Sequence, residues 1–359
     1  MKAAVISLGS KSSLMLVESL KNYFDVVDNI HLKNIEVNLG KEGGIFYQGN
    51  KLDHYDCIYL KGSFRYAQLL RSIAAMLEGK IPYMPLPANA FTTIHNKLLT
   101  HLVLEQQHIP MPKTYISATT ESAKELLVKV NFPIVMKFPE GTQGKGVMFA
   151  DSKSSASSLL DALGALNQPF IIQEYVETGG TDIRALVVGD KVIAAMKRTA
   201  QKEEKRANLH AGGYGTPVQL TREVNKLAVD TAKALGVDIC GVDILEGPLG
   251  PYVIEANISP GLQGLTKVST IDLPDEIAQF LYTKTQQTLS QTAKEVTKDA
   301  LREISVNRNP LGPQEIVTQL KFRGERILLP ELVTKMTQFS DQKEYTFKAQ
   351  KGKLEIEEI

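Results

Sequence analysis

The sequence predicts an α/β protein of several domains: a parallel α/β unit, two α+β units and a small β-rich segment. Three observations lead to this prediction. Strand-like and helix-like segments alternate over the first 90 residues, a glycine-bearing turn joins two apolar strands near residue 140, and two later apolar strands carry acidic and amide side chains. Alternating strands and helices are typical of a parallel sheet flanked by helices.

Length and composition are those of an ordinary globular protein. The chain has 359 residues, enough for two or three domains. It is 43% hydrophobic and 23% charged, and its net charge of +1 provides no strong field for nucleic acid or an acidic membrane. No apolar run approaches the ~20 residues that span a bilayer, and no apolar signal region precedes the first strand. We therefore expect a cytoplasmic protein, in which Cys57 and Cys240 are buried thiols.

The first predicted domain covers residues 1–90. Lys2–Leu8 and Cys57–Leu60 read as strands, and Lys11–Lys21 and Tyr66–Leu77 read as helices. This order predicts parallel pairing of the strands. A proline-rich stretch at residues 81–87 closes the domain.

The second predicted domain covers residues 91–176. Leucines at helical spacing predict a helix over Asn96–Gln107, which Pro110 and Pro112 terminate. The later predicted elements are, in order, a helix at Ser122–Val130, strands at Ile134–Phe138 and Val147–Ala150, a helix at Ser152–Leu166 and a strand at Phe170–Tyr175.

The third predicted domain covers residues 177–289. Its first two strands, Ile183–Val188 and Lys191–Met196, are joined at Gly189-Asp190, which is a two-residue hairpin signal. An amphipathic helix at Thr221–Leu235 follows, and Gly236 can terminate it. Two further strands complete the domain.

These last two strands carry the most informative side chains of the sequence. Gly241–Ile244 contains Asp243, and Val253–Asn257 contains Glu255 and Asn257, which share one face because side chains alternate along a strand. If the two strands are neighbours, three oxygen-bearing groups converge. Close carboxylates repel each other unless a cation lies between them, and such a donor set suits Mg²⁺ with substrate phosphate. The sequence therefore predicts a metal and nucleotide enzyme.

A possible phosphate-binding region precedes this pair. The turn Glu140–Gly146 lacks the Walker A order, and its glycines can form either a flap over phosphates or only a tight hairpin. Lys137 lies in an apolar strand, where it needs an anionic partner or a route to solvent at the strand end. Lys97, at the start of a helix, is uninformative by itself.

A hinge-like segment follows the strand that ends near Tyr175. Gln173–Val176 can offer backbone N–H and C=O groups to an adenine edge, or it is an ordinary strand end. Asp182 and Arg184 lie on one face, where Asp182 could accept from ribose hydroxyls and Arg184 could clamp a carboxylate or phosphate. The alternative for these two residues is a surface ion pair.

The polar stretch from Lys197 to Gly213 contains Arg206 and Asn208 and can position an anionic substrate, although a solvated loop is the alternative. His210 has no neighbouring His or Cys at zinc spacing. There is also no Ser/His/Asp or Cys/His nucleophile pattern.

In order and spacing, these segments resemble an ATP-grasp ligase, and more narrowly a RimK-type α-L-glutamate ligase, over residues 92–285. The resemblance implies the ATP-grasp fold, with a pre-ATP-grasp domain at 1–90, a central subdomain at 91–176 and a C-terminal subdomain with the metal site at 177–289. It rests on Lys137, Glu140–Gly144, Gln173–Tyr175, Asp182–Arg184, Asn208–His210, Ile239–Leu245 and Glu255–Leu262.

The resemblance also implies roles for single residues. The cofactors are ATP and two Mg²⁺ ions, with Mn²⁺ as an alternative, and Glu255 bridges the two ions. Arg184 or Arg206 stabilises charge on the tetrahedral intermediate. The nucleotide would be bound by Lys97, Lys137 and Gly144 at the phosphates, Glu174 and Tyr175 at the adenine, Asp182 at the ribose, and Arg206 and Asn208 at the γ-phosphate; the metals would be held by Asp243, Glu255 and Asn257.

The implied reaction has two steps and needs no protein nucleophile. A substrate carboxylate attacks the γ-phosphate to give an acyl phosphate, and an amine then displaces phosphate to form an amide. The implied partners are ATP, L-glutamate and a carboxylate acceptor, which is a protein C-terminus, a poly-glutamate chain or a glutamyl coenzyme. A homo-oligomer is expected, and a membrane or nucleic acid is not.

Two other functions remain open. One is an ATP-grasp ligase of lysine or arginine biosynthesis that modifies an amino group. The other is a regulatory protein whose nucleotide occupancy controls its C-terminal segment. The sequence leaves open the acceptor, the α or γ linkage, single or repeated addition, and the oligomeric state.

Three parts of the chain depart from the family pattern. Lys145 occupies a flap position where an apolar residue is expected, and Lys61–Arg65 replaces a Pro-Arg-containing loop. Residues 290–359 lie outside the resemblance, and we expect a linker helix and a β-rich appendage there. The appendage, through Lys321–Leu332 and its last strands, faintly resembles AbrB-type hairpin barrels. Dimerisation or acceptor docking is favoured over DNA binding.

Overall fold

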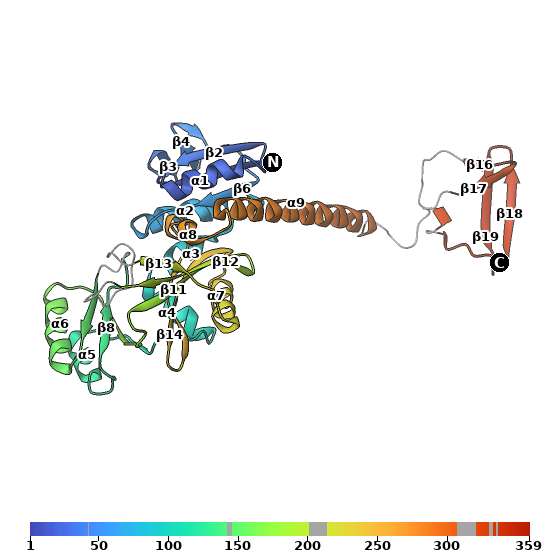
Figure 1. The fold of residues 1–359 in the computed structure, drawn as a ribbon. Coiled ribbons are helices and arrows are strands. Elements are labelled where there is room, and N and C mark those ends of the chain that lie inside the picture. Colours follow the sequence, from blue (N-terminus) through green and yellow to red (C-terminus); the bar gives the residue numbers. More distant parts are fainter. Residues whose placement is uncertain (42, 142–145, 201–213, 307–320, 330–332, 335–336) are drawn as a thin grey trace. The chain divides into compact units, whose positions relative to one another are not determined.

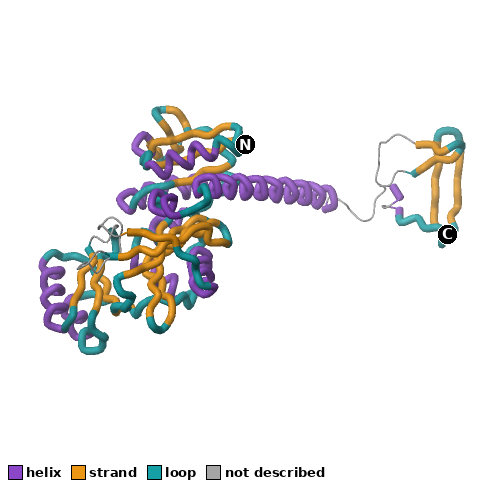
Figure 2. Tube along the Cα trace, viewed as in Figure 1, coloured by secondary structure: helices purple, strands orange, loops and turns teal. Residues whose placement is uncertain are grey.

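The computed structural model describes residues 1–41, 43–141, 146–200, 214–306, 321–329, 333–334 and 337–359. The chain forms two compact units, Met1–Lys294 and Glu295–Ile359 (Figure 1). The first unit contains three main sheets with their covering helices, and the second contains the end of a long helix and two hairpins (Figure 2).

The first unit begins with a parallel three-stranded sheet in the order β2-β1-β6. Its elements are β1 (Lys2–Ser7), α1 (Lys11–Leu20), β2 (Val26–His31), β6 (Cys57–Leu60) and α2 (Ala67–Leu77). The predicted parallel pairing is confirmed. Strands β1 and β6 form because each is an almost continuous apolar run buried on both faces, which is typical of parallel sheets.

The sequence did not predict β2 or a small antiparallel sheet beside it. That sheet contains β3 (Ile35–Asn38), β4 (Gly44–Tyr47) and β5 (Asn50–Lys51) in chain order. Strand β2 is an edge strand with only Ile30 buried, so its side chains carry no apolar pattern to recognise. The strands of the neighbouring sheet are also short and partly exposed, so they too carry no apolar pattern long enough to predict them.

A four-stranded antiparallel sheet follows, in the order β7-β10-β8-β9. Helices α3 (Ala88–Thr93) and α4 (Lys97–Gln106) lead into it. Helices α5 and α6 contribute to a core of their own beneath this sheet, which contains Met136, Leu160 and Ile172. The elements are β7 (Thr114–Tyr115), α5 (Thr120–Leu126), β8 (Ile134–Lys137), β9 (Val147–Ala150), α6 (Lys153–Ala165) and β10 (Ile171–Glu174).

A five-stranded antiparallel sheet carries the predicted metal strands, in the order β13-β12-β11-β14-β15. Helix α7 packs against it and shares one continuous core with the N-terminal sheet. The predicted turn at Gly189-Asp190 is confirmed, since Val188 pairs with Lys191. The elements are β11 (Thr181–Val188), β12 (Lys191–Thr199), β13 (Tyr214–Pro217), α7 (Arg222–Ala234), β14 (Ile239–Gly247), β15 (Gly250–Asn257) and α8 (Gln263–Val268).

Helix α9 (Leu273–Val306) buries one face near its start through Leu273, Ile277 and Leu281. In the second unit, two antiparallel hairpins confirm the predicted β-rich end. They are β16 (Lys321–Arg323) with β17 (Arg326–Leu328), and β18 (Tyr345–Gln350) with β19 (Lys353–Glu358). Among the described helices, none is both long and apolar enough to cross a membrane.

Gly189 provides a test of how the β11–β12 hairpin packs against α9. Its φ is +64°, and a Cβ there would lie 2.6 Å from Phe280, whereas Gly236, with φ +67°, has open space around it. Gly236→Ala should therefore cost about 1 kcal/mol of backbone strain alone, and Gly189→Ala about 1–3 kcal/mol more because of overpacking. Urea unfolding of both variants measures the difference, and equal losses would contradict the packing.

Candidate active site

The three predicted metal ligands leave one face of two paired strands. In the β14–β15 ladder, Asp243 lies opposite Glu255, and Gly241 lies opposite Asn257. Directly opposed residues of an antiparallel pair project from the same face, and Glu255 and Asn257 are two residues apart. The expectation that Asp243 lies on the strand adjacent to Glu255 and Asn257 is confirmed. The register shifts immediately after Asp243.

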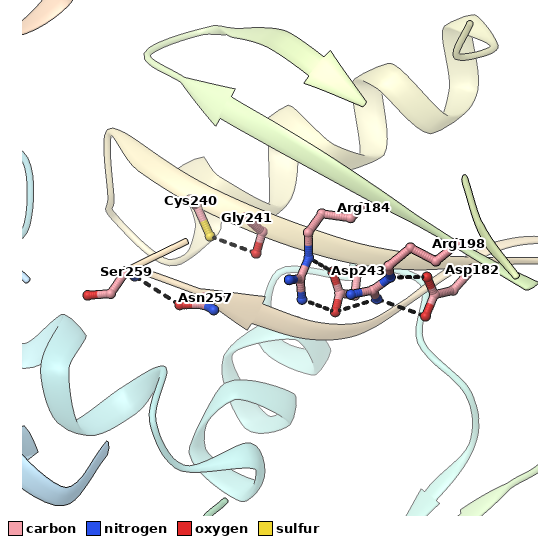
Figure 3. Close-up of polar contacts among 8 residues, drawn as sticks. All are labelled: Asp182, Arg184, Arg198, Cys240, Gly241, Asp243, Asn257 and Ser259. Carbon is pink, nitrogen blue, oxygen red and sulfur yellow. Dashed lines mark hydrogen bonds and ion pairs between the residues drawn. The ribbon is translucent and has the colours of Figure 1, made fainter. Parts of the chain in front are cut away.

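Asp243 is held by two arginines, Arg184 from the neighbouring strand β11 and Arg198 from the next strand of the sheet, β12 (Figure 3). Arg184 donates Nε to Oδ1 at 2.7 Å and Nη2 to Oδ2 at 2.6 Å. Arg198 places Nη2 2.8 Å from Oδ2 of Asp243, and it also forms a two-bond pair with Asp182 at 2.5 and 2.8 Å. Asp182 and Arg184 thus pair across strands and not with each other, so the alternative of one surface ion pair is wrong.

The sheet register creates this charge cluster. Asp182 is directly opposite Arg198 in the β11–β12 ladder, and Arg184 is directly opposite Asp243 in the β11–β14 ladder. Two cations therefore meet two carboxylates, and the group is neutral as a whole. Three of the four residues are less than one-tenth exposed, so the pairs are needed to offset desolvation.

The cluster changes the acidity of its members. Burial opposes ionisation of Asp243, but Arg184 and Arg198 outweigh it and lower the pKa of that carboxyl to about 2. Burial raises the pKa of Asp182, whose ion-pair partner among the described residues is Arg198. For Arg198, burial works against the charge, yet the Asp243 and Asp182 carboxylates raise its pKa.

The donor set fits a hard divalent cation. Oδ1 of Asp243 accepts one hydrogen bond, so it keeps a lone pair, and the Glu255 side chain has no hydrogen bond or ion pair with any described residue. Asn257 accepts from the Ser259 N–H at 2.9 Å through Oδ1, which also retains a lone pair. No described group of three or more His, Cys, Asp or Glu side chains could hold a metal, so the set depends on the Asn257 amide.

Lys137 is placed by a hydrogen-bond network. Its Nζ donates to Oε1 of Gln173 at 2.6 Å, so the Gln173 amide must direct both its hydrogens away from Lys137. These reach Nε2 of His101 at 3.0 Å and Oγ1 of Thr114 at 2.9 Å. His101 therefore accepts at Nε2 and donates from Nδ1 to the Lys97 carbonyl, 2.6 Å away.

This network joins the two predicted phosphate-binding lysines. Burial lowers the pKa of His101 to about 4, so its imidazole is neutral at pH 7 as the network requires. Burial also lowers the pKa of Lys137 to about 8, which the Glu255 charge partly offsets. Lys97 donates Nζ to the Gly141 carbonyl at 2.9 Å. Sequence analysis missed His101, whose signal was its position one helical turn after Lys97.

The hinge residues are less available than expected. The N–H groups of Glu174 and Tyr175 donate to the carbonyls of Lys113 and Pro133 at 2.9 and 3.1 Å. The Glu174 carboxylate accepts from the Tyr115 hydroxyl and the Asn131 side chain. An adenine edge would therefore have to meet carbonyls or later N–H groups of this segment. The N–H groups of these two residues are therefore not available to a nucleotide, and the expectation that the segment Gln173–Val176 contacts adenine stays a prediction.

Several predicted site residues lie outside the described residues: Gly144 and Lys145 in the flap, and Arg206, Asn208 and His210 in the polar stretch. Beside Glu255 and Asn257, a cavity of about 360 Å³ opens toward the N-terminal sheet, and Lys61 and Lys97 also line it. Lys61 is buried, and sequence analysis noted only that its loop departs from the family pattern.

Comparison with known proteins matches residues 94–281 to the RimK-like ATP-grasp domain. A Pseudoalteromonas atlantica protein named "Probable alpha-L-glutamate ligase 2" is 36% identical over 266 residues, 74% of this chain and 88% of that one. The chain belongs to the RimK-like ATP-grasp family. The predicted enzyme class, an ATP-dependent amino-acid ligase, is thereby confirmed.

A second relative shows how much of this RimK-like ligase is shared with a shorter protein of the same family. The Thioalkalivibrio sulfidiphilus protein named "Probable alpha-L-glutamate ligase" is 34% identical over 301 residues, 81% of this chain and 99% of that one. Almost all of that protein is matched, so the unmatched part of this ligase has no counterpart there. Residues 282–359 lie beyond the matched ATP-grasp domain.

Solved structures confirm the predicted ATP-grasp fold of the RimK-like ligase. ATP-grasp ligase PsnB, complexed with a minimal precursor, superposes with a TM-score of 0.62 at 19% identity over 79% of this chain and 98% of that one. A RimK domain protein of Sphaerobacter thermophilus gives 0.61 at 16% identity over 78% and 99%. PsnB has also been solved with Mg and ADP.

The ion-pair cluster of this RimK-like ligase predicts unequal roles for its two arginines. Arg198→Met leaves Asp182 without its partner and weakens Asp243, which should cost about 3–5 kcal/mol of unfolding free energy. Arg184→Met leaves Asp243 paired with Arg198 and should cost about 1–3 kcal/mol. Urea unfolding of the nucleotide-free protein measures both, with exposed Arg222→Met as the control. Equal losses for the two buried arginines would contradict the shared role of Arg198.

Proposed function

We propose that this ligase joins L-glutamate to a carboxylate-bearing acceptor through an amide bond, using ATP and two Mg²⁺ ions, for which Mn²⁺ can substitute. The observation that supports the proposal is the shared face of Asp243, Glu255 and Asn257, in a chain about 35% identical to proteins named as glutamate ligases. The acceptor is a protein C-terminus, a poly-glutamate chain or a glutamyl coenzyme.

The first chemical step is attack of the acceptor carboxylate on the γ-phosphate, which forms an acyl phosphate and releases ADP. The amine of glutamate then attacks the acyl carbon, the amide bond forms, and phosphate leaves with the electrons of the broken C–O bond. Catalysis of this kind depends on positioning and charge neutralisation. The bound metal ions would neutralise phosphate charge at Asp243, Glu255 and Asn257.

The nucleotide would be held by residues from both antiparallel sheets. Lys137 is positioned for phosphate by Gln173, and Lys97 by the start of α4 beside Gly141. In this proposal the flap with Gly144 would cover the phosphates, and backbone carbonyls near Glu174 and Tyr175 would meet the adenine. Asp182 would accept hydrogen bonds from the ribose hydroxyls through the carboxylate lone pairs that are not used by Arg198. Arg206 and Asn208 complete the γ-phosphate end.

Arg184 is the proposed stabiliser of the tetrahedral intermediate, with Arg206. Its Nε and Nη2 are bonded to Asp243, so Nη1 is left for the substrate, and its side chain is 20% exposed whereas that of Arg198 is 5% exposed. A guanidinium fixed in this way needs little reorganisation as negative charge develops on the reacting oxygen. Arg198, by comparison, supports the cluster from within.

The reaction is tested by phosphate release from Mg²⁺·ATP with each amino acid supplied singly, followed by mass spectrometry of the products. We expect release that depends on L-glutamate, and products whose mass increases by one or more glutamyl residues. Acceptors of the three classes are then compared. If another amino acid supports release and glutamate does not, the substrate assignment is wrong.

Glu255 is the carboxylate on which the metal proposal depends most. Glu255→Gln keeps the shape of the side chain but removes its charge, so turnover should fall about 100-fold or more. Glu246→Gln is the matched control, since Glu246 is an exposed carboxylate on β14. Phosphate release measures turnover, and thermal unfolding verifies the fold. Turnover within a few-fold of the unmodified enzyme would contradict the metal assignment.

A further inference from the structure

The cavity beside the metal ligands is built at the edge of the parallel N-terminal sheet. Strand β1 lies between β2 and β6. From β1 the chain continues to β2 on one side, whereas the later strand β6 is added on the other side, so the strand order reverses at β1. The crevice outside the carboxyl ends at such a point is the usual ligand site of parallel α/β sheets. Ser10 follows β1 and Lys61 follows β6, and both line the cavity.

Lys61 is a buried cation without an anionic partner. Its side chain lies at the cavity wall, the residue is 5% exposed, and its ammonium has no hydrogen bond or ion pair with any described residue. The Tyr59 ring, with Nζ 4.9 Å from its centroid, is the contact that the ammonium makes. Burial lowers its pKa to about 8, so the charged form is present at neutral pH at a cost in stability.

Lys137 shows how this chain treats a comparable lysine. It is half-buried at the end of β8, and its ammonium donates to Gln173 and lies in the field of Glu255. A buried ammonium that lacks both kinds of support is expensive, and its partner is then expected to be a bound anion. The Lys61 ammonium is therefore expected to pair with an anionic group of a bound ligand.

The walls of the cavity decide how an anionic ligand would be oriented. Ser10, the N-cap of the ten-residue helix α1, lines the cavity, so the positive end of that helix lies beside it. Glu255 and Asn257 line the cavity from β15, where a second negative charge requires cations. His95 also lines the cavity, and burial lowers its pKa to about 4, so it contributes no charge at pH 7.

The segments that line the cavity from the N-terminal sheet and from β15 are fixed to each other. The Gly62 N–H, next to Lys61, donates to the Ser259 hydroxyl at 3.0 Å, and the Ser12 hydroxyl accepts from the Leu262 N–H at 2.9 Å. Ser259 and Leu262 follow directly after β15. Lys61 is thus held in a set position relative to Asn257 and Glu255.

We propose that Lys61 binds a carboxylate of the ligase's organic substrate in this cavity, while the reacting end of the substrate lies toward Glu255 and Asn257. The inference rests on the proposed function and names the residue that recognises the substrate. A volume of about 360 Å³ suits one amino acid or the end of a glutamyl peptide. The carboxylate comes from either the free amino acid or the acceptor.

The test is direct binding of L-glutamate and of L-glutamyl-L-glutamate to the full chain with Mg²⁺·ADP present, measured by calorimetry. Lys61→Met removes the charge at nearly constant volume and should weaken one of the two ligands at least tenfold. Lys61→Arg should retain most of the binding, and exposed Lys80→Met, the matched control, should retain all of it. The ligand that is weakened identifies the source of the carboxylate.

Two further measurements separate binding from folding. The affinity for Mg²⁺·ADP should be unchanged in Lys61→Met, and its thermal midpoint should be no lower than that of the unmodified protein, because an unpaired buried charge is removed. Equal binding of both ligands by Lys61→Met and the unmodified protein overturns the proposal. Failure of both ligands to bind the unmodified protein also overturns it.

The outcomes also distinguish this inference from the proposed function. If carboxylate binding depends on Lys61 but no amino acid stimulates phosphate release, the inference stands and the ligase proposal falls. If glutamate is ligated and Lys61→Met leaves the KM of both organic substrates unchanged, the ligase proposal stands and Lys61 has no part in recognition.

Discussion

The register of the five-stranded sheet is the constraint on which the site depends. It sets Asp182 opposite Arg198, Arg184 opposite Asp243, and Asp243 opposite Glu255. A slip of one residue would turn each of these side chains to the other face of its strand. The same ladders that bury the apolar core therefore also place the charges, so the predicted metal ligands and the fold cannot vary independently.

The candidate site is built from elements that belong to two separate hydrophobic cores of the first unit. The parallel sheet and the five-stranded sheet share one core, and Gly62 and Ser12 bond directly to the chain after β15. The four-stranded sheet, with Lys137, has a core of its own. The cavity lined by Lys61 and the predicted metal ligands thus belong to one packed body, whereas Lys137 comes from the other and is held there by its bond to Gln173.

The sequence was most informative at positions where a polar side chain or a glycine interrupts an apolar strand. Acidic and amide groups on apolar strands predicted that Asp243 lies on the strand beside Glu255 and Asn257, and glycine at a hairpin signal predicted the turn at Gly189-Asp190; the sheet register confirms both. Prediction from sequence failed for β2, an edge strand with little burial, and for the partners of Asp182 and Arg184. Those partners are set by pairing between strands far apart in the chain, which local periodicity does not encode.

By itself, the sequence determined the ATP-grasp fold and the family, and it led to the prediction of Asp243, Glu255 and Asn257 as metal ligands, because each depends on residue type and short spacing. Tertiary structure decided which charges are neutralised by partners among the described residues and which are not. Arg184 and Lys137 have partners, whereas Lys61 has none among the described residues, although all three occur in or beside apolar strands. Burial and partner choice depend on contacts across the sheets, and only the folded chain brings these residues together.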